Sequence, residues 1–151
     1  YRLLTSAFLH FGFPHLVNNM VMLICLGSYL ERALGKIKYI IFYLAAAVGS
    51  SLASLGIMLY TGNIAVSAGA SGAIFGIIGA LLYMLIRNRG RFADLTMMRF
   101  LLMIALSLYY GFSSTGVDNA AHVGGLVIGF VLGVILYRKD RHYRYYHQRM
   151  H

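Results

Sequence analysis

The sequence predicts an all-α polytopic membrane protein with five membrane-spanning helices. Of its 151 residues, 60% are hydrophobic and 11% are charged, whereas a soluble domain carries about 25% charged residues. The mean hydropathy is +0.71. The charged residues are gathered into short clusters, and the neutral stretches between them approach the roughly 20 apolar residues that a helix needs to cross a bilayer.

The first three predicted helices cover residues 14–32, 36–60 and 71–87. Pro14 suits the first turn of a helix, where its missing N–H is not needed. The third helix opens on Ser71, directly after a glycine-containing polar loop. We therefore expect a serine at the membrane surface end of an otherwise apolar helix.

The last two predicted helices cover residues 94–112 and 119–137. Asp94 is expected to cap the first of them, since its carboxylate can accept from free backbone N–H groups. Arg99, just inside that helix, is expected to extend its charged head towards the membrane surface.

The basic residues predict the orientation of the chain. Twelve of the 13 Lys and Arg residues lie on alternate loops or in the C-terminal tail, and the exception is Arg2. Because cytoplasmic loops carry the excess of Lys and Arg, the N-terminus is expected outside and the C-terminus in the cytoplasm. The net charge of +9 is thus explained by topology, and we expect no nucleic-acid partner.

Residues 1–139 are interpreted as the membrane core and 140–151 as a basic cytoplasmic tail. The tail is interpreted as an anchor at an anionic lipid surface. A partner-binding or metal-binding tail is the alternative, since it contains His142, His147 and His151. Their spacing matches no specific metal site, so we expect no metal and no cofactor.

Four polar residues are expected at the same depth. Ser71 begins the third helix and His122 lies one turn into the fifth, each after an outside loop. His15 and Asn19 lie in the first turns of the first helix, which enters from outside. Ionisable or reactive groups within spanning helices are functional candidates, because lipid offers them no hydrogen bonds. The topology therefore predicts one shared site just below the outer surface.

Two stripes of small residues predict close approach of the third and fifth helices, since such residues let helix backbones meet in lipid. The stripes contain Gly72 and Gly76 on the third helix and Gly125, Gly129 and Gly133 on the fifth. Close approach would bring Ser71 and His122 within hydrogen-bond reach. Phe75, one turn below Ser71, is expected to pack beside the imidazole.

This set of residues suits covalent hydrolysis. Neutral His122 can remove the proton that makes the Ser71 hydroxyl a poor nucleophile. Attack on a peptide carbonyl creates an oxyanion, which the helix N-terminus at Ser71 favours. His15 and Asn19 could donate further hydrogen bonds to it. The glycines that flank the nucleophile, Gly69 and Gly72, leave room for the substrate backbone.

Each residue also has a simpler interpretation. Ser71 could bond a carbonyl one turn back, His122 could be a proton relay or an interhelical contact, and Asn19 could join helices. Asp118, four residues before His122, is disfavoured as a third catalytic member because it lies at the helix entrance. The functional interpretation depends on the conjunction of these residues at one depth.

Four motifs, in order, resemble the rhomboid family of intramembrane serine proteases. They are the N-terminal stretch that ends in His15-LVN-Asn19, the segment LGSYLERALG with Glu31 and Gly35, GASG with Gly69 and Ser71, and AHVGGLVIG with His122, Gly125 and Gly129. The resemblance covers nearly the whole chain. It implies a Ser71–His122 dyad without a third acid, and an oxyanion site formed by the Ser71 N–H, His15 and Asn19.

The resemblance also implies the substrates and the setting. Substrates would be membrane proteins, cut at or near a transmembrane segment after lateral entry past a mobile helix, here residues 94–112. Arg2 and Glu31 would be structural. The family core has six spans and this chain has five, so the first is missing and we expect a fragment of a longer protein. A bacterial cytoplasmic membrane is the favoured location, and the oligomeric state stays open.

Two other functions are alternatives for these residues. A non-catalytic rhomboid-like protein would bind transmembrane helices, but such relatives usually lack the serine or the histidine. A small transporter or proton channel would use His10, His15 and His122. The polar groups cluster near one surface, however, and no polar path continues inward.

Overall fold

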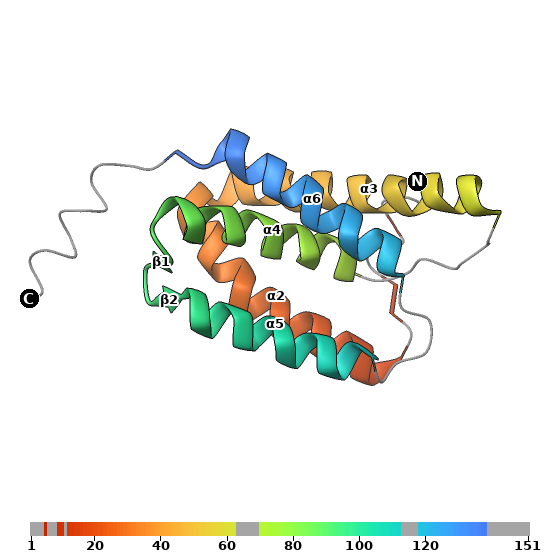
Figure 1. The fold of residues 1–151 in the computed structure, drawn as a ribbon, viewed down its shortest axis with the longest axis horizontal. Coiled ribbons are helices and arrows are strands. Elements are labelled where there is room, and N and C mark those ends of the chain that lie inside the picture. The colour runs from red at the N-terminus through yellow and green to blue at the C-terminus, as the bar shows by residue number, and fades with distance from the viewer. Residues whose placement is uncertain (1–4, 6–8, 11, 63–69, 113–117, 139–151) are drawn as a thin grey trace, which may run out of the picture.

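The computed structural model describes residues 5, 9–10, 12–62, 70–112 and 118–138. In this part of the chain the predicted all-α architecture is confirmed, with one addition, a two-stranded hairpin (Figure 1). The elements are α2 (Phe13–Leu34), α3 (Lys36–Thr61), α4 (Ser71–Arg87), β1 (Arg91–Phe92), β2 (Leu95–Thr96), α5 (Met97–Phe112) and α6 (Asn119–Leu136).

Three of these helices, α2, α3 and α6, are long and apolar enough to cross a membrane, judged on the described residues alone. The other two are apolar but shorter, and α4 has 17 residues. A helix of that length rises about 25 Å, slightly less than the roughly 30 Å hydrocarbon core. Eleven of the 17 residues of α4 are buried, so protein rather than lipid surrounds most of this helix.

The helix limits follow local sequence signals. Pro14 occupies the first turn of α2, as predicted. Gly35 separates α2 from α3 with φ +81° and donates its amide to the carbonyl of Glu31 at 2.8 Å. Gly62 ends α3 in the left-handed region with φ +72°, a conformation that glycine adopts without steric cost. The predicted limits of α4 are confirmed at both ends.

The predicted start of α5 at Asp94 is wrong. Residues 91–96 form the antiparallel hairpin β1–β2, with Asp94 in its turn beside Ala93 at φ +52°. Helix α5 begins at Met97, where the amide of Arg99 donates to Oγ1 of Thr96 at 3.3 Å. Asp94 instead accepts from the hydroxyl of Tyr29 on α2 at 3.1 Å. A cluster of turn residues, Asn88 to Gly90, was the overlooked signal for this break.

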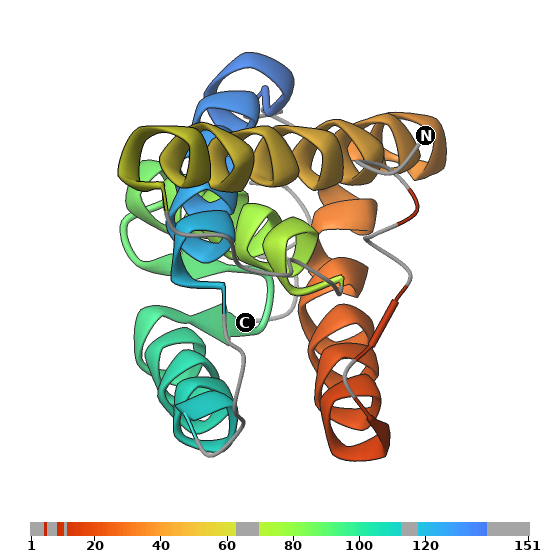
Figure 2. The same ribbon diagram turned by 90° about the vertical axis from the view of Figure 1, so that its right-hand side faces the viewer.

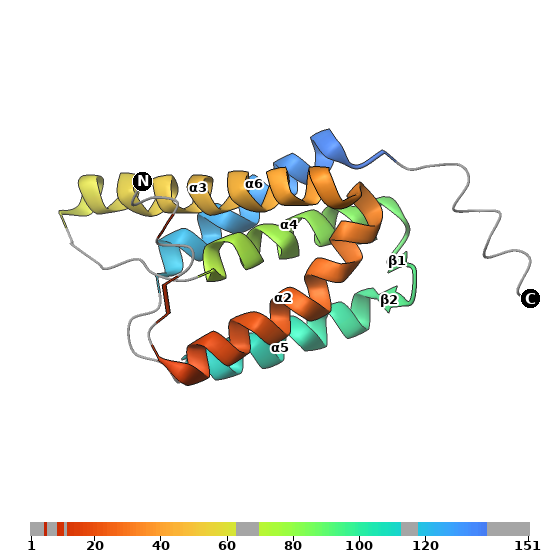
Figure 3. The same ribbon diagram turned by 180° about the vertical axis from the view of Figure 1, so that it is seen from behind.

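Helix α4 is the centre of the bundle. It packs most extensively against α6, and also against α3 and α2 (Figures 1 and 2). The described part of α5 lies beside α2 and is joined to α4 through the hairpin (Figure 3). The largest fully buried side chains include Phe42, Leu30, Leu81 and Phe100, which come from α3, α2, α4 and α5.

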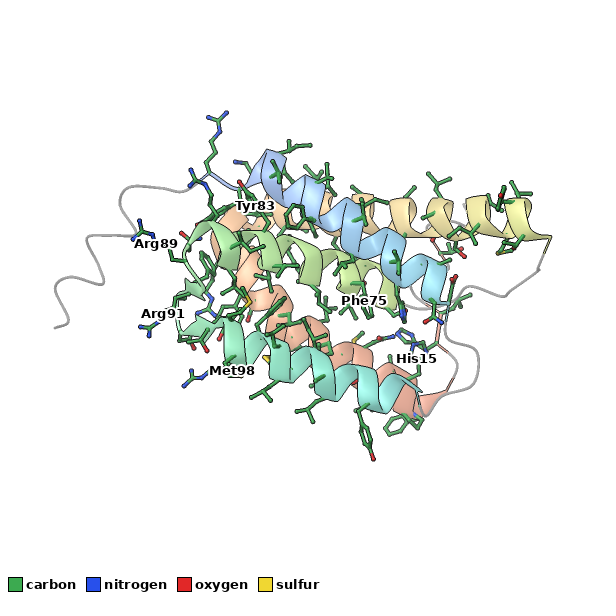
Figure 4. The ribbon with its side chains drawn as sticks, viewed as in Figure 1. His15, Phe75, Tyr83, Arg89, Arg91 and Met98 are labelled. Atoms are coloured by element: carbon green, nitrogen blue, oxygen red, sulfur yellow. The ribbon has the colours of Figure 1, made fainter. Side chains whose placement is uncertain are left out.

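The two ends of the bundle differ in chemistry. Arg89 and Arg91 lie at the end that carries the hairpin, whereas His15 and Phe75 lie towards the opposite end (Figure 4). The α2–α3 junction and the C-terminus of α6 also lie at the basic end (Figure 1). The alternation of basic loops in the sequence therefore becomes a segregation of charge in space.

Candidate active site

Ser71 is the first residue of α4 and is half-buried. No side chain among the described residues caps this helix. The first backbone N–H groups of a helix lack an intrahelical partner, so they add a positive partial charge around the serine. The serine therefore lies where negative charge is favoured.

His122 lies one turn into α6 and faces Ser71. Its Nε2 is 3.0 Å from the Ser71 hydroxyl oxygen, although the two residues are 51 positions apart in the sequence. At this distance the hydroxyl can donate to the imidazole. Both side chains are half-buried, so the pair is neither fully exposed to solvent nor sealed in the core.

The contact between the two helices depends on glycine. A Cβ added at Gly125 would overlap the carbonyl oxygen of Gly72, and one added at Gly129 would overlap that of Gly76. The backbones of α4 and α6 are therefore in direct contact, as the small-residue stripes predicted. This approach carries His122 to Ser71.

Gly72 and Gly76 play a second part that the sequence did not indicate. A Cβ at Gly72 would overlap the Ser50 hydroxyl, and one at Gly76 would lie 2.7 Å from Cβ of Ala46. Both of these neighbours lie on α3. The side of each glycine where a Cβ would stand thus faces α3, while its carbonyl faces α6. Three helices therefore converge below Ser71.

Phe75 orients the imidazole. Its ring stacks on that of His122 with centroids 4.2 Å apart and an interplanar angle of 11°. Phe75 lies one turn after Ser71 on the same face of α4. The same helix face therefore supplies both the hydroxyl and the flat surface against which the imidazole rests.

His15 and Asn19 form a pair on α2 at the same end of the molecule. Asn19 Nδ2 lies 3.1 Å from Nε2 of His15, and the Asn19 side chain is buried. The His10 ring meets the His15 ring edge-on, with centroids 5.5 Å apart. His15 lies at the end of the bundle where α6, the helix of His122, begins (Figure 4).

The Asp118 carboxylate contacts the backbone of α6 and a side chain of α3. Its Oδ1 accepts from the backbone N–H of Ala121 at 2.9 Å, and its Oδ2 accepts from the Ser54 hydroxyl at 2.5 Å. Sequence reasoning missed Ser54, which is buried on α3. Its signal was present, since Ser50 and Ser54 are four residues apart and form a polar stripe within an apolar helix.

The remaining predicted residues divide into two groups. Glu31 is half-buried in the last turn of α2. Gly69, Arg2 and the tail 140–151 lie outside the described residues. Within the described ranges, no group of three His, Cys, Asp or Glu side chains is arranged to hold a metal ion. The chemistry available at this site is that of a hydroxyl, imidazoles, an amide and backbone N–H groups.

Comparison with known proteins gives a consistent family assignment. The family described as Rhomboid domain matches residues 1–139. Rhomboid protease GluP of Bacillus subtilis is 40% identical over 136 residues, which cover 90% of this chain and 26% of that protein. RHOMBOID-like protein 5 of Arabidopsis thaliana is 40% identical over 138 residues, covering 90% of this chain and 44% of its own length.

A further relative is matched over more of its own length. The putative rhomboid protease YdcA of Bacillus subtilis is 29% identical over 144 residues, which cover 95% of this chain and 71% of that protein. The chain spans less than half the length of GluP and of RHOMBOID-like protein 5.

Proposed function

The chain belongs to the rhomboid family, and from that premise we propose that it is the core of an intramembrane serine endopeptidase. The proposed reaction is hydrolysis of a peptide bond at or near the membrane segment of a transmembrane protein. The observation that carries the proposal is the 3.0 Å contact between Ser71 Oγ and His122 Nε2. Packing alone does not account for a hydroxyl and an imidazole in contact within a membrane protein, because lipid offers these polar groups no hydrogen bonds.

The proposed reaction proceeds through an acyl-enzyme. His122 takes the proton of the Ser71 hydroxyl as its oxygen attacks the scissile carbonyl carbon. Collapse of the tetrahedral intermediate breaks the C–N bond, and the imidazolium gives its proton to the leaving amine. Water then attacks the ester with His122 again as base, which releases the new carboxyl end and restores the serine hydroxyl.

The proposed oxyanion site has two sources of donors. The backbone N–H of Ser71 belongs to the N-terminus of α4, where no described side chain caps the helix, and preorganised donors of this type stabilise the transition state. The Asn19 amide and the His15 imidazole supply the others from α2. Their mutual contact at 3.1 Å holds them together before substrate arrives, so less reorganisation is needed during the reaction.

The proposed setting follows from the separation of charge along the bundle. The basic end, with Arg89 and Arg91 (Figure 4), is assigned to the cytoplasm by the positive-inside rule. The site around Ser71 then lies near the extracytoplasmic face, where water can reach it. Transmembrane protein substrates and the bilayer are the expected partners, and a bacterial cytoplasmic membrane is the favoured location.

The test is labelling of the full-length, detergent-solubilised protein with a fluorophosphonate probe. We expect labelling of the wild type and its loss in both Ser71→Ala and His122→Ala, because the probe reacts only with an activated serine. Ser51→Ala is the matched control and should label normally, since that hydroxyl donates to the Ala47 carbonyl at 3.0 Å.

Two results would overturn the proposal. One is full labelling of a folded Ser71→Ala or His122→Ala protein. The other is no labelling of a folded wild type, which would favour a rhomboid-like protein that binds transmembrane helices without cleaving them.

A further inference from the structure

Asp118 defines the first turn of α6. Its side-chain Oδ1 accepts from the backbone N–H of Ala121 at 2.9 Å, and its backbone carbonyl accepts from the N–H of His122 at 3.1 Å. A side-chain oxygen at this position satisfies a backbone donor that the helix itself leaves without a partner. The backbone positions of Ala121 and His122 therefore both depend on hydrogen bonds to Asp118.

The same carboxylate joins α6 to α3. Its Oδ2 accepts from the Ser54 hydroxyl at 2.5 Å, across 64 positions of sequence. The Ser54 side chain is only 2% exposed. Hydrogen bonds from a hydroxyl to a carboxylate are short and stronger than those between neutral groups. The link thus joins a half-buried carboxylate to a hydroxyl that is itself shielded from water.

The helices leave little room for adjustment at this level. A Cβ added at Gly124 would overlap that of Ala53, and one at Gly49 would lie 2.8 Å from Cδ1 of Ile128. Figures 1 and 3 show α3 and α6 running side by side. The Ser54–Asp118 bond therefore fixes the depth and rotation of the α6 N-terminus against a closely packed neighbour.

We propose that Asp118 is a positioning residue for the reaction, which acts by fixing the first turn of α6 to α3 through Ser54 and so holds His122 at Ser71. This inference rests on the proposed peptidase function. It differs from a triad, because both carboxylate oxygens have partners on α3 or α6 and the carboxylate works through the backbone. Ser54 is its partner in that role.

The test uses the rate of fluorophosphonate labelling of the full-length protein. Asp118→Ala removes the cap and the α3 link, and its labelling should be about tenfold slower or more, since displacing a reacting group by about 1 Å can cost about 100-fold. Asp118→Asn can keep both contacts, because its Oδ1 can accept from the Ala121 N–H while its Nδ2 donates to the Ser54 hydroxyl oxygen, and it should stay within about twofold of the wild type. Ser54→Ala removes only the link and should be about 2- to 5-fold slower.

Two further measurements separate positioning from a general loss of structure. In the double variant Ser54→Ala/Asp118→Ala the rate should equal that of Asp118→Ala alone, because the shared bond can be lost only once. The controls are Ser51→Ala and Asn119→Ala, which alter the neighbouring serine on α3 and the exposed neighbour of Asp118. Both should label at the wild-type rate.

The outcomes are distinct. If the wild type is not labelled, the peptidase proposal fails. If the wild type is labelled, wild-type rates in folded Asp118→Ala would overturn the inference, as would Asp118→Asn being as slow as Asp118→Ala. Multiplicative effects in the double variant would also overturn it. Should Asp118→Ala fail to fold, Asp118→Asn and Ser54→Ala still decide, and a wild-type rate in Ser54→Ala would then overturn it.

Discussion

At the scale of single residues, the surroundings of Ser71 separate into groups proposed to take part in the reaction and groups that hold them in place. His122 touches the serine hydroxyl, and Phe75 holds the imidazole plane by stacking at 4.2 Å. Asn19 is held by His15 and is buried. These roles differ in their expected cost on substitution.

Asn19→Ala should lower kcat for cleavage of a transmembrane substrate by about 100- to 1000-fold, the usual effect of losing one oxyanion donor. KM should change little, because the donor acts mainly on the charge of the transition state. Steady-state kinetics of the full-length protein measure both. Asn18→Ala alters the adjacent amide and is the control. A large change in KM with kcat preserved would contradict the oxyanion role.

Phe75→Ala should slow fluorophosphonate labelling by up to about tenfold, since an aromatic pair contributes about 0.5–1.5 kcal/mol. Phe75→Tyr keeps the ring and should label at nearly the wild-type rate. The comparison measures the contribution of the ring face alone. If Phe75→Ala labelled as fast as Phe75→Tyr in folded protein, the stack would have no part in orienting His122.

At the scale of helices, α4 and α6 meet through their backbones rather than through side chains. The α4–α6 contact lies at Gly125 and Gly129, where any Cβ would overlap a carbonyl of α4. Glycine normally weakens a helix by about 1 kcal/mol relative to alanine. Here that cost is offset by van der Waals contact between the backbones of α4 and α6, which stabilises helix association in a membrane.

Gly129→Ala should therefore destabilise the protein by about 1–3 kcal/mol, as overpacking does, despite the higher helix propensity of alanine. Gly56→Ala on α3 is the matched control, because nothing lies within 4 Å of a Cβ there, and it should leave stability unchanged or raise it slightly. Thermal unfolding in detergent measures both. Equal melting temperatures would contradict the backbone contact between α4 and α6.

The start of α5 shows how an element can depend on a neighbour. Asp94 accepts from Tyr29 of α2 and lies in the hairpin, so Thr96 receives the Arg99 amide in its place. Arg99 itself reaches back to the Asp94 carbonyl at 3.1 Å. The basic end of α5 is thereby attached to α2.

At the scale of the whole molecule, the basic side chains and the proposed site lie towards opposite ends of the bundle. Arg89 and Arg91 lie at one end, and His15 and Phe75 lie towards the other (Figure 4). An arrangement of this kind sets the orientation in the membrane. It also separates the proposed site at Ser71 from the basic end by the length of α4.

This orientation can be measured with a membrane-impermeant maleimide on intact cells. In a Cys25→Ser background, Thr61→Cys should be labelled and Arg89→Cys should be labelled only after lysis. The C-terminal ends of α3 and α4 lie at opposite ends of the bundle (Figure 1), and the proposed topology puts them on opposite sides of the membrane. Both positions are exposed. The reverse pattern would place the Ser71 site on the cytoplasmic side and contradict the proposed topology.

Features set by residues close together in the sequence, such as helix limits and helix faces, could be predicted from the sequence. Hydropathy located the helices, and the limits of α4 were correct. Glycine spacing indicated which helices touch and so predicted the contact of Ser71 with His122. Helical periodicity put Phe75 one turn after Ser71, beside the imidazole. Each of these follows from helical periodicity and from the cost of polar groups in lipid.

By itself, then, the sequence determined the all-α membrane fold and the Ser71–His122 encounter, while the tertiary structure alone decided what fixes them. The Ser54–Asp118 bond spans 64 positions, and the faces of Gly72 and Gly76 meet α3 as well as α6. The hairpin likewise displaced the start of α5 from Asp94 to Met97. Such contacts depend on the depth and rotation at which whole helices pack, and no local pattern encodes that relation between distant segments.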